Sequence, residues 1–159
     1  MEEKDDTYEI FIYQNLAKNY IFTISSSTLT TEVRYLDASQ PTGEFKTFLK
    51  REKEHEYDVI DGGDRFYIRS NWKAPNFRLF ETPINKIAKT DWKEVIPHKT
   101  DYYLEDVIVF KDYIVASTKF EGLDQLLVKD RTNGTEYFIP FTDKAYTAEP
   151  DAQSEYQSK

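Results

Sequence analysis

The feature that most constrains the fold of this chain is an internal repeat. Three stretches, 18–49, 64–96 and 111–139, share one plan, in which three strand-like runs are separated by two polar turns. Matching apolar positions recur at steps of roughly 45–49 residues, which is the span of one four-stranded blade of a β-propeller. The matched positions are Tyr20, Phe66 and Tyr113 in the first run, and Val33, Phe77 and Leu126 in the next. The runs 8–13, 55–60 and 105–110 precede the three stretches and supply a fourth strand to each.

Short runs rich in β-branched and aromatic residues predict strands along the whole chain. Aromatic residues make up 16% of the sequence, which favours pleated strands over helices. The segment 84–89 has one apolar pair at helical spacing and is interpreted as a loop. Strands are predicted near 8–13, 19–25, 31–37, 44–49, 55–60, 65–70, 76–82, 92–96, 105–110, 112–118, 123–130 and 135–140.

Turn residues between these runs predict how the strands connect. The sequences DGGD at 61–64 and TNGT at 132–135 supply the positive φ that tight hairpins require, and PTGE at 41–44 is a similar turn. Tight hairpins make successive strands neighbours in an antiparallel sheet. The predicted fold is therefore all-β, a partial propeller of about three four-stranded antiparallel blades.

The predicted domain spans 1–146, with blades near 8–49, 55–96 and 105–140, and 147–159 is expected to be a disordered tail. The run 107–110 is apolar at every position, so both faces of a strand can be buried. Such imperfect alternation of apolar and polar residues along a strand is typical of sheets that pack on both sides.

Charge and composition exclude several classes of function. The chain has 21 basic and 29 acidic residues, a formal charge of −8, and it lacks the basic surface that nucleic-acid binding requires. It contains no cysteine, which excludes disulfides and thiolate chemistry and suits a reducing compartment such as the cytoplasm. Neither an ordinary signal peptide nor an apolar stretch of membrane-spanning length is present in the sequence, so no membrane partner is expected.

The sequence contains no recognisable catalytic motif. Hydrolases of the α/β type carry a nucleophilic serine in a G-x-S-x-G elbow, which is absent, and the serines at 25–27 are interpreted as a polar turn. His55 lies in a charged strand entrance, and His98 follows Pro97 in a loop between blades. Both histidines are predicted to be surface residues, because neither belongs to a ligand-like cluster.

The remaining polar motifs also favour structural roles. The acidic runs 2–6 and 52–56 lack the alternating oxygen donors and central glycine of a calcium loop. Gly62 and Gly63 form a hairpin and not a phosphate cradle, because no helix follows them. No catalytic, metal, cofactor or identified substrate-binding residue is therefore assigned, and no cofactor is expected.

Several segments of the amino-acid sequence between residues 2 and 146 resemble those of a known protein family. The segments are EEKDDTYEI, TEVRYLDAS, PTGEFKTF, REKEHEYDV, DRFYIRSN, NFRLFETP, WKEVIPH, LEDVIVFKDYIV and EGLDQLLV. In this order and spacing they resemble the propeller domain of the prolyl oligopeptidase family of serine peptidases, specifically its oligopeptidase B (protease II) subfamily.

The resemblance implies a cytosolic peptidase with a seven-bladed propeller and an α/β-hydrolase domain that carries a serine, aspartate and histidine triad. Such an enzyme cleaves short peptides after arginine or lysine, while the propeller limits access to oligopeptides. The triad lies in the other domain, so this chain is expected to be a natural or engineered piece that is inactive alone. Its expected partners are the parent's catalytic domain and oligopeptide substrates.

An alternative remains open, in which the chain is a free-standing interaction module that binds peptides or proteins at its blade edges. In either case, three blades cut from a ring leave two outer faces bare, so a homo-oligomer is expected. The residues proposed for these bare faces are Tyr20, Phe22, Ile24, Ile114, Leu127 and Ile139.

Overall fold

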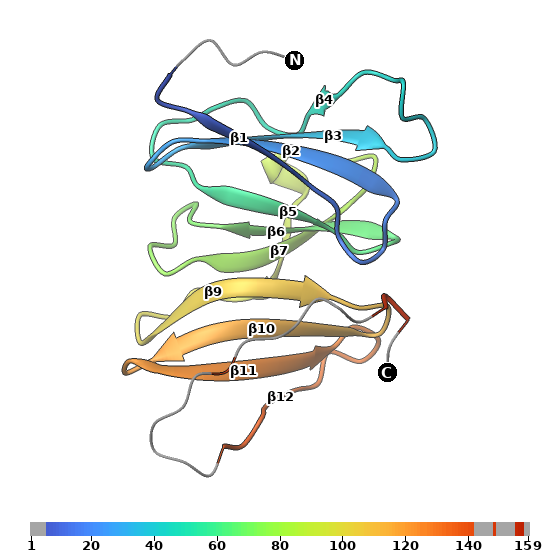
Figure 1. Cartoon of the computed structure of the whole chain (residues 1–159). Coiled ribbons are helices and arrows are strands. Elements are labelled where there is room, and N and C mark those ends of the chain that lie inside the picture. Colours follow the sequence, from blue (N-terminus) through green and yellow to red (C-terminus); the bar gives the residue numbers. More distant parts are fainter. Residues whose placement is uncertain (1–5, 142–147, 149–154, 158–159) are drawn as a thin grey trace.

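The structure is a computed structural model that describes residues 6–141, 148 and 155–157. The described residues form three four-stranded sheets, here called the first, second and third blades, which are stacked in chain order (Figure 1). The first blade consists of β1 (Glu9–Tyr13), β2 (Tyr20–Ser26), β3 (Thr31–Asp37) and β4 (Lys46–Thr47). The second consists of β5 (Tyr57–Asp61), β6 (Arg65–Ser70), β7 (Arg78–Pro83) and β8 (Lys93–Ile96). The third consists of β9 (Tyr102–Val109), β10 (Tyr113–Phe120), β11 (Leu123–Asp130) and β12 (Glu136–Phe138).

Within each blade the strands pair antiparallel in the order of the sequence. The predicted all-β fold of three four-stranded meanders is therefore confirmed. The short 3₁₀ helix η1 (Lys89–Asp91) lies between β7 and β8. None of the described residues forms a helix long and apolar enough to cross a membrane.

The glycine hairpins form where the sequence predicts them. Gly63 has φ +85° between β5 and β6, and Gly134 has φ +76° between β11 and β12. Most strand ends differ from the prediction by one or two residues, and β4 and β9 differ most clearly. β4 is only two residues long, although the next residue, Phe48, is buried between blades and still donates its N–H to the Val33 carbonyl of β3 at 2.9 Å. β9 begins at Tyr102 because a bulge lets pairing with β10 continue.

The repeat alignment is displaced in the second blade. Tyr20 and Tyr113 begin β2 and β10, whereas Phe66 is the second residue of β6. Phe77, which the sequence matches with a residue inside β3, lies just before β7. Its φ of +62° interrupts extended backbone at this point, so the strand begins one residue later.

Two apolar cores lie between the blades, one on each face of the second blade. Along β6, Phe66 and Ile68 belong to the core shared with the first blade, whereas Tyr67 belongs to the core shared with the third. Phe66 is fully buried, and its ring centroid lies 5.0 Å from that of Tyr20 and 5.5 Å from that of Tyr35. Both faces of the second blade are therefore buried, which explains why apolar and polar residues alternate imperfectly along its strands.

The prediction of the bare outer faces was wrong for most of the residues chosen. Five of the six pack between blades, and Ile139 is half-buried. In β2 the chosen residues form the more apolar face, and this face packs against the second blade because burial favours it; β10 is apolar on both faces and carries no such signal. The five packed residues are Tyr20, Phe22, Ile24, Ile114 and Leu127. The exposed large apolar side chains on first and last strands are instead Ile10, Phe11, Ile12, Tyr137 and Phe138.

Of the predicted tail 147–159, residues 147, 149–154 and 158–159 lie outside the described part, so disorder there stays a prediction. Tyr156 is described, and it contacts the turns of the second and third blades.

Candidate functional site: a polar seam across the blade turns

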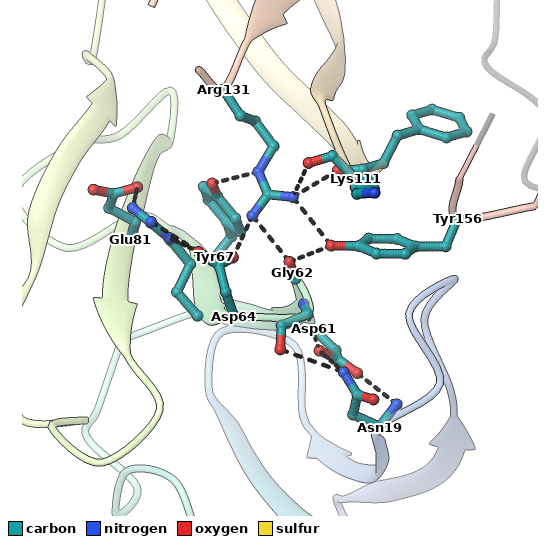
Figure 2. Close-up of polar contacts among 12 residues, drawn as sticks. Asn19, Asp61, Gly62, Asp64, Tyr67, Glu81, Lys111, Arg131 and Tyr156 are labelled. Carbon is teal, nitrogen blue, oxygen red and sulfur yellow. Dashed lines mark hydrogen bonds and ion pairs between the residues drawn. The ribbon is translucent and has the colours of Figure 1, made fainter. Parts of the chain in front are cut away.

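Polar groups from all three blades meet at the hairpin Asp61–Asp64 between β5 and β6, which we call the DGGD hairpin (Figure 2). Antiparallel meanders place the β1–β2, β5–β6 and β9–β10 turns at the same end of the stacked sheets. The turn after β11 reaches the same end. Backbone and charged groups of three blades therefore come within hydrogen-bonding distance here.

On the side of the first blade, the seam is built on the buried carboxylate of Asp61. Its Oδ2 accepts a hydrogen bond from the Asn19 backbone N–H at 2.8 Å, and its Oδ1 accepts one from Gly63 N–H at 2.9 Å. The Asp61 N–H donates to Asn15 Oδ1 at 2.9 Å. A buried charge needs such partners, so the β1–β2 turn has a fixed position against the second blade.

On the side of the third blade, the seam is built on Arg131, whose side chain is 8% exposed. Its Nη2 donates to the Gly62 carbonyl at 2.9 Å and lies 2.6 Å from Asp64 Oδ1. Its Nε donates to the Tyr67 hydroxyl at 2.9 Å, and the guanidinium carbon lies 5.2 Å from the centre of the Tyr67 ring. One side chain of the third blade thus binds backbone, carboxylate and aromatic groups of the second.

The remaining nitrogen of Arg131, Nη1, binds its own blade and Tyr156. Nη1 donates to the carbonyls of Phe110 and Lys111 at 2.8 and 2.6 Å, and to the Tyr156 hydroxyl at 3.2 Å. All five N–H groups of the guanidinium are therefore used within the chain. Arg131 joins blades and has no donor left for an anionic ligand.

His55 was predicted at the surface, and this prediction was wrong. The side chain is 5% exposed, its ring stacks on Tyr57 at 5.0 Å, and Nε2 lies 2.8 Å from Ser70 Oγ. Nδ1 lies 3.6 Å from Glu52 Oε2. Antiparallel pairing of β5 with β6 sets Tyr57 opposite Ser70, and this brings His55, two residues before β5, to the end of β6, where it is buried.

Ser70, His55 and Glu52 have the residue types of a hydrolytic triad, yet their placement excludes that role. Ser70 is fully buried, and its Oγ also accepts a hydrogen bond from Trp72 N–H at 3.1 Å. A nucleophile must reach a substrate carbonyl, so a hydroxyl without solvent access cannot serve. The three residues instead attach the segment before β5 to the end of β6.

Burial lowers the pKa of His55 to about 4, and the nearby Lys89 ammonium acts in the same direction. The imidazole is therefore neutral at neutral pH, and one of its nitrogens can serve as the acceptor for Ser70.

The other residues weighed in the sequence also have local roles. Ser25 Oγ accepts a hydrogen bond from Arg51 Nη2 at 2.9 Å, and Ser27 lies in the β2–β3 turn. His98 is half-buried between β8 and β9. Of the acidic run 2–6, residues 2–5 lie outside the described part. Within the described ranges no group of three or more His, Cys, Asp or Glu residues could hold a metal ion.

Residues 1–159 match the family model for the N-terminal β-propeller domain of prolyl oligopeptidase. The chain belongs to the prolyl oligopeptidase family. The resemblance of the sequence to this family's propeller is therefore confirmed.

Named relatives include dipeptidyl aminopeptidase BI of Pseudoxanthomonas mexicana, 29% identical over 92% of this chain and 20% of that protein. Protease 2 of Moraxella lacunata is 31% identical over 80% of this chain and 18% of that protein. Oligopeptidase B from Trypanosoma brucei, with covalently bound antipain in its closed form, has the same fold with a TM-score of 0.88 at 22% identity. That match covers 98% of this chain and 24% of the other. The chain thus spans about a fifth of the length of these curated relatives, as one portion of a prolyl oligopeptidase propeller.

Substitution of Arg131 by lysine should destabilise the chain by about 2–3 kcal/mol, because a single ammonium cannot replace the planar fork and leaves buried acceptors unpaired. The matched control is Arg34→Lys, whose guanidinium is 36% exposed and forms an ion pair with Glu32 at 2.8 Å. It should cost less than about 1 kcal/mol. Urea unfolding at pH 7 measures both, and equal losses would contradict the role given to Arg131.

The stability of the chain should depend on pH through His55. Between pH 6.5 and 4 the unfolded chain binds a proton at this residue that the folded chain does not, so the free energy of unfolding falls as the pH falls. The slope from this residue is at most about 1.4 kcal/mol per pH unit. His55→Gln removes this contribution, while the carboxylates titrate alike in both proteins. Parallel stability curves for parent and variant would show that His55 is not the cause.

Proposed function

We propose that this chain is the non-catalytic, substrate-gating part of a cytoplasmic serine peptidase of the prolyl oligopeptidase family. The complete protein cleaves short peptides after arginine or lysine, and its α/β-hydrolase domain supplies the catalytic residues. The observation that carries this proposal is the fit of nearly the whole chain to part of an oligopeptidase B that holds antipain covalently in a closed form.

The arrangement of the blades supports a gating role. The second blade is buried on both faces between its neighbours, so the three stacked blades form a stiff wall, and a wall around an active site admits only chains narrow enough to pass. The surplus of acidic residues favours the approach of cationic peptides, in agreement with cleavage after arginine or lysine. The Ser70–His55 pair lies inside the wall between strands and takes no part in this role.

The purified chain should hydrolyse no arginine- or lysine-ended reporter peptide above background. Replacing the matching segment of Moraxella lacunata Protease 2 by this chain should preserve cleavage of a short reporter and exclude a folded protein substrate. The parent Protease 2 is the control for both substrates. Two outcomes would contradict the proposal. One is activity of the isolated chain that survives repurification and is blocked by a serine-directed phosphonate. The other is a chimera that cuts folded protein as readily as the short reporter.

A second function, a module that binds partners at a blade edge, is favoured by one observation. β1 is the first strand of its sheet, and its Phe11 and Ile12 side chains are 54% and 71% exposed. An edge strand presents unpaired backbone groups, and exposed apolar side chains beside them favour pairing with another strand. The occupant this edge fits best is a second copy of the chain.

If β1 acts as such an edge, light scattering at tens of micromolar should show a discrete dimer. Ile12→Lys should convert it to a monomer, because a lysine on an edge strand opposes pairing. Leu29→Lys is the control, since Leu29 is similarly exposed but lies in the β2–β3 turn. A parent chain that is already monomeric, or equal effects of the two variants, would remove support for this second function.

A further inference from the structure

A hollow of about 480 Å³ lies between the turns of the second and third blades, bordered by the DGGD hairpin, Arg131 and the β9–β10 turn. Tyr156 forms part of its lining, although it follows the last strand by 18 positions. Figure 2 shows the phenol ring pointing from the chain end toward Gly62 and Arg131. This contact joins a segment outside the three sheets to the seam.

Three hydrogen bonds hold Tyr156 in place. Its hydroxyl donates to the Gly62 carbonyl at 2.6 Å and accepts from Arg131 Nη1 at 3.2 Å. Its backbone carbonyl accepts from the Lys111 N–H at 2.8 Å. The hydroxyl is thus recognised both as donor and as acceptor, which a phenylalanine ring could not satisfy.

The groups that surround this hydroxyl are also held by contacts that do not involve Tyr156. Arg131 is oriented by its bonds to Asp64 and Tyr67, so its Nη1 group needs no rearrangement to reach the phenol. Gly63 has a positive φ and no side chain, and a Cβ at this position would lie 2.4 Å from the Tyr156 hydroxyl oxygen. Gly63 therefore allows the hairpin turn and leaves space for the tyrosine hydroxyl.

We propose that the seam between the second and third blades is a binding site for a tyrosine side chain carried on a peptide segment outside the sheets. Tyr156 occupies the site in cis, and a tyrosine-bearing peptide occupies it in trans when Tyr156 is removed. The site rests only on contacts within this chain and does not depend on the proposed peptidase function.

Tyr156 and a free tyrosine peptide compete for the site, and the outcome depends on the concentration of each near it. A segment of the same chain reaches the site at an effective concentration in the millimolar range or above, so it excludes free peptides of modest affinity. The intact chain should therefore bind tyrosine peptides poorly. Removal of the Tyr156 side chain should expose the affinity of the site itself.

The test uses the full 159-residue chain carrying Tyr156→Ala, with acetyl-Glu-Tyr-Gln-amide, the sequence of residues 155–157, as the probe. Binding is followed by the NMR signals of the Lys111 amide and the Arg131 Nε–H. The variant should bind this peptide at least about tenfold more tightly than the parent chain does. It should bind acetyl-Glu-Phe-Gln-amide at least about fivefold more weakly than the tyrosine peptide, because the hydroxyl contacts are lost.

Two further variants keep the test decisive. Tyr156→Phe removes only the hydroxyl and should shift the Arg131 Nε–H signal while the fold persists. Tyr137→Ala removes an exposed tyrosine on β12 and should leave both signals unchanged, with no gain in peptide binding. The proposal is overturned if Tyr156→Ala and Tyr156→Phe leave both signals at their parent positions. It is equally overturned if the Ala variant binds the tyrosine and phenylalanine peptides alike.

Discussion

The burial of both faces of the second blade is the constraint on which the remaining architecture depends. Along β6, Phe66 and Ile68 pack toward the first blade while Tyr67 packs toward the third, so one strand contributes to two cores. Packed sheets lie about 10 Å apart, and aromatic side chains fill that distance well. Each neighbouring blade therefore has one face covered and is held at a defined spacing from the second. The opposite faces of the first and third blades are not covered by another described blade, which is the geometry of an open arc of blades.

Apolar packing sets the spacing of the blades, but it does not by itself fix how far one sheet slides against the next. The polar seam supplies that specificity, because a buried carboxylate or guanidinium loses much of its stability if its partners shift. Asp61 requires the β1–β2 turn at one position, and Arg131 requires the DGGD hairpin at one position. The four-residue hairpin thus fixes the first and third blades at once. Gly62 is needed because a Cβ there would lie 2.6 Å from the Tyr67 ring that Arg131 covers, and Gly63 is needed because its φ is +85°.

The sequence predicted what depends on neighbouring residues, and it failed where distant segments meet. Strand positions, the glycine hairpins and the three-blade plan follow from local propensity and turn chemistry, and the structure confirms them. The inward face of β10 could not be predicted, because both of its faces carry apolar residues, whereas the apolar face of β2 was wrongly assigned to the bare side. The seam was missed for another reason. Arg131 meets Gly62 across 69 positions and Tyr156 meets it across 94, and no local pattern marks an arginine that will be buried. The DGGD sequence marks the position of the seam, but its residues predict only a turn and not contacts with distant segments.

The burial of His55 shows why residue types alone do not define a catalytic site. Ser70, His55 and a carboxylate lie next to one another in space, with Ser70 Oγ 2.8 Å from the imidazole. Catalysis by such a set needs a base whose pKa lies near the working pH and a nucleophile open to substrate. Burial lowers the pKa of His55 to about 4, so at neutral pH it is a poor acceptor for the serine proton, and Ser70 has no exposed surface. The same low-dielectric surroundings strengthen the hydrogen bond between them. A set of groups that would be reactive in an open cleft therefore serves inside this blade to hold the segment before β5 against the end of β6.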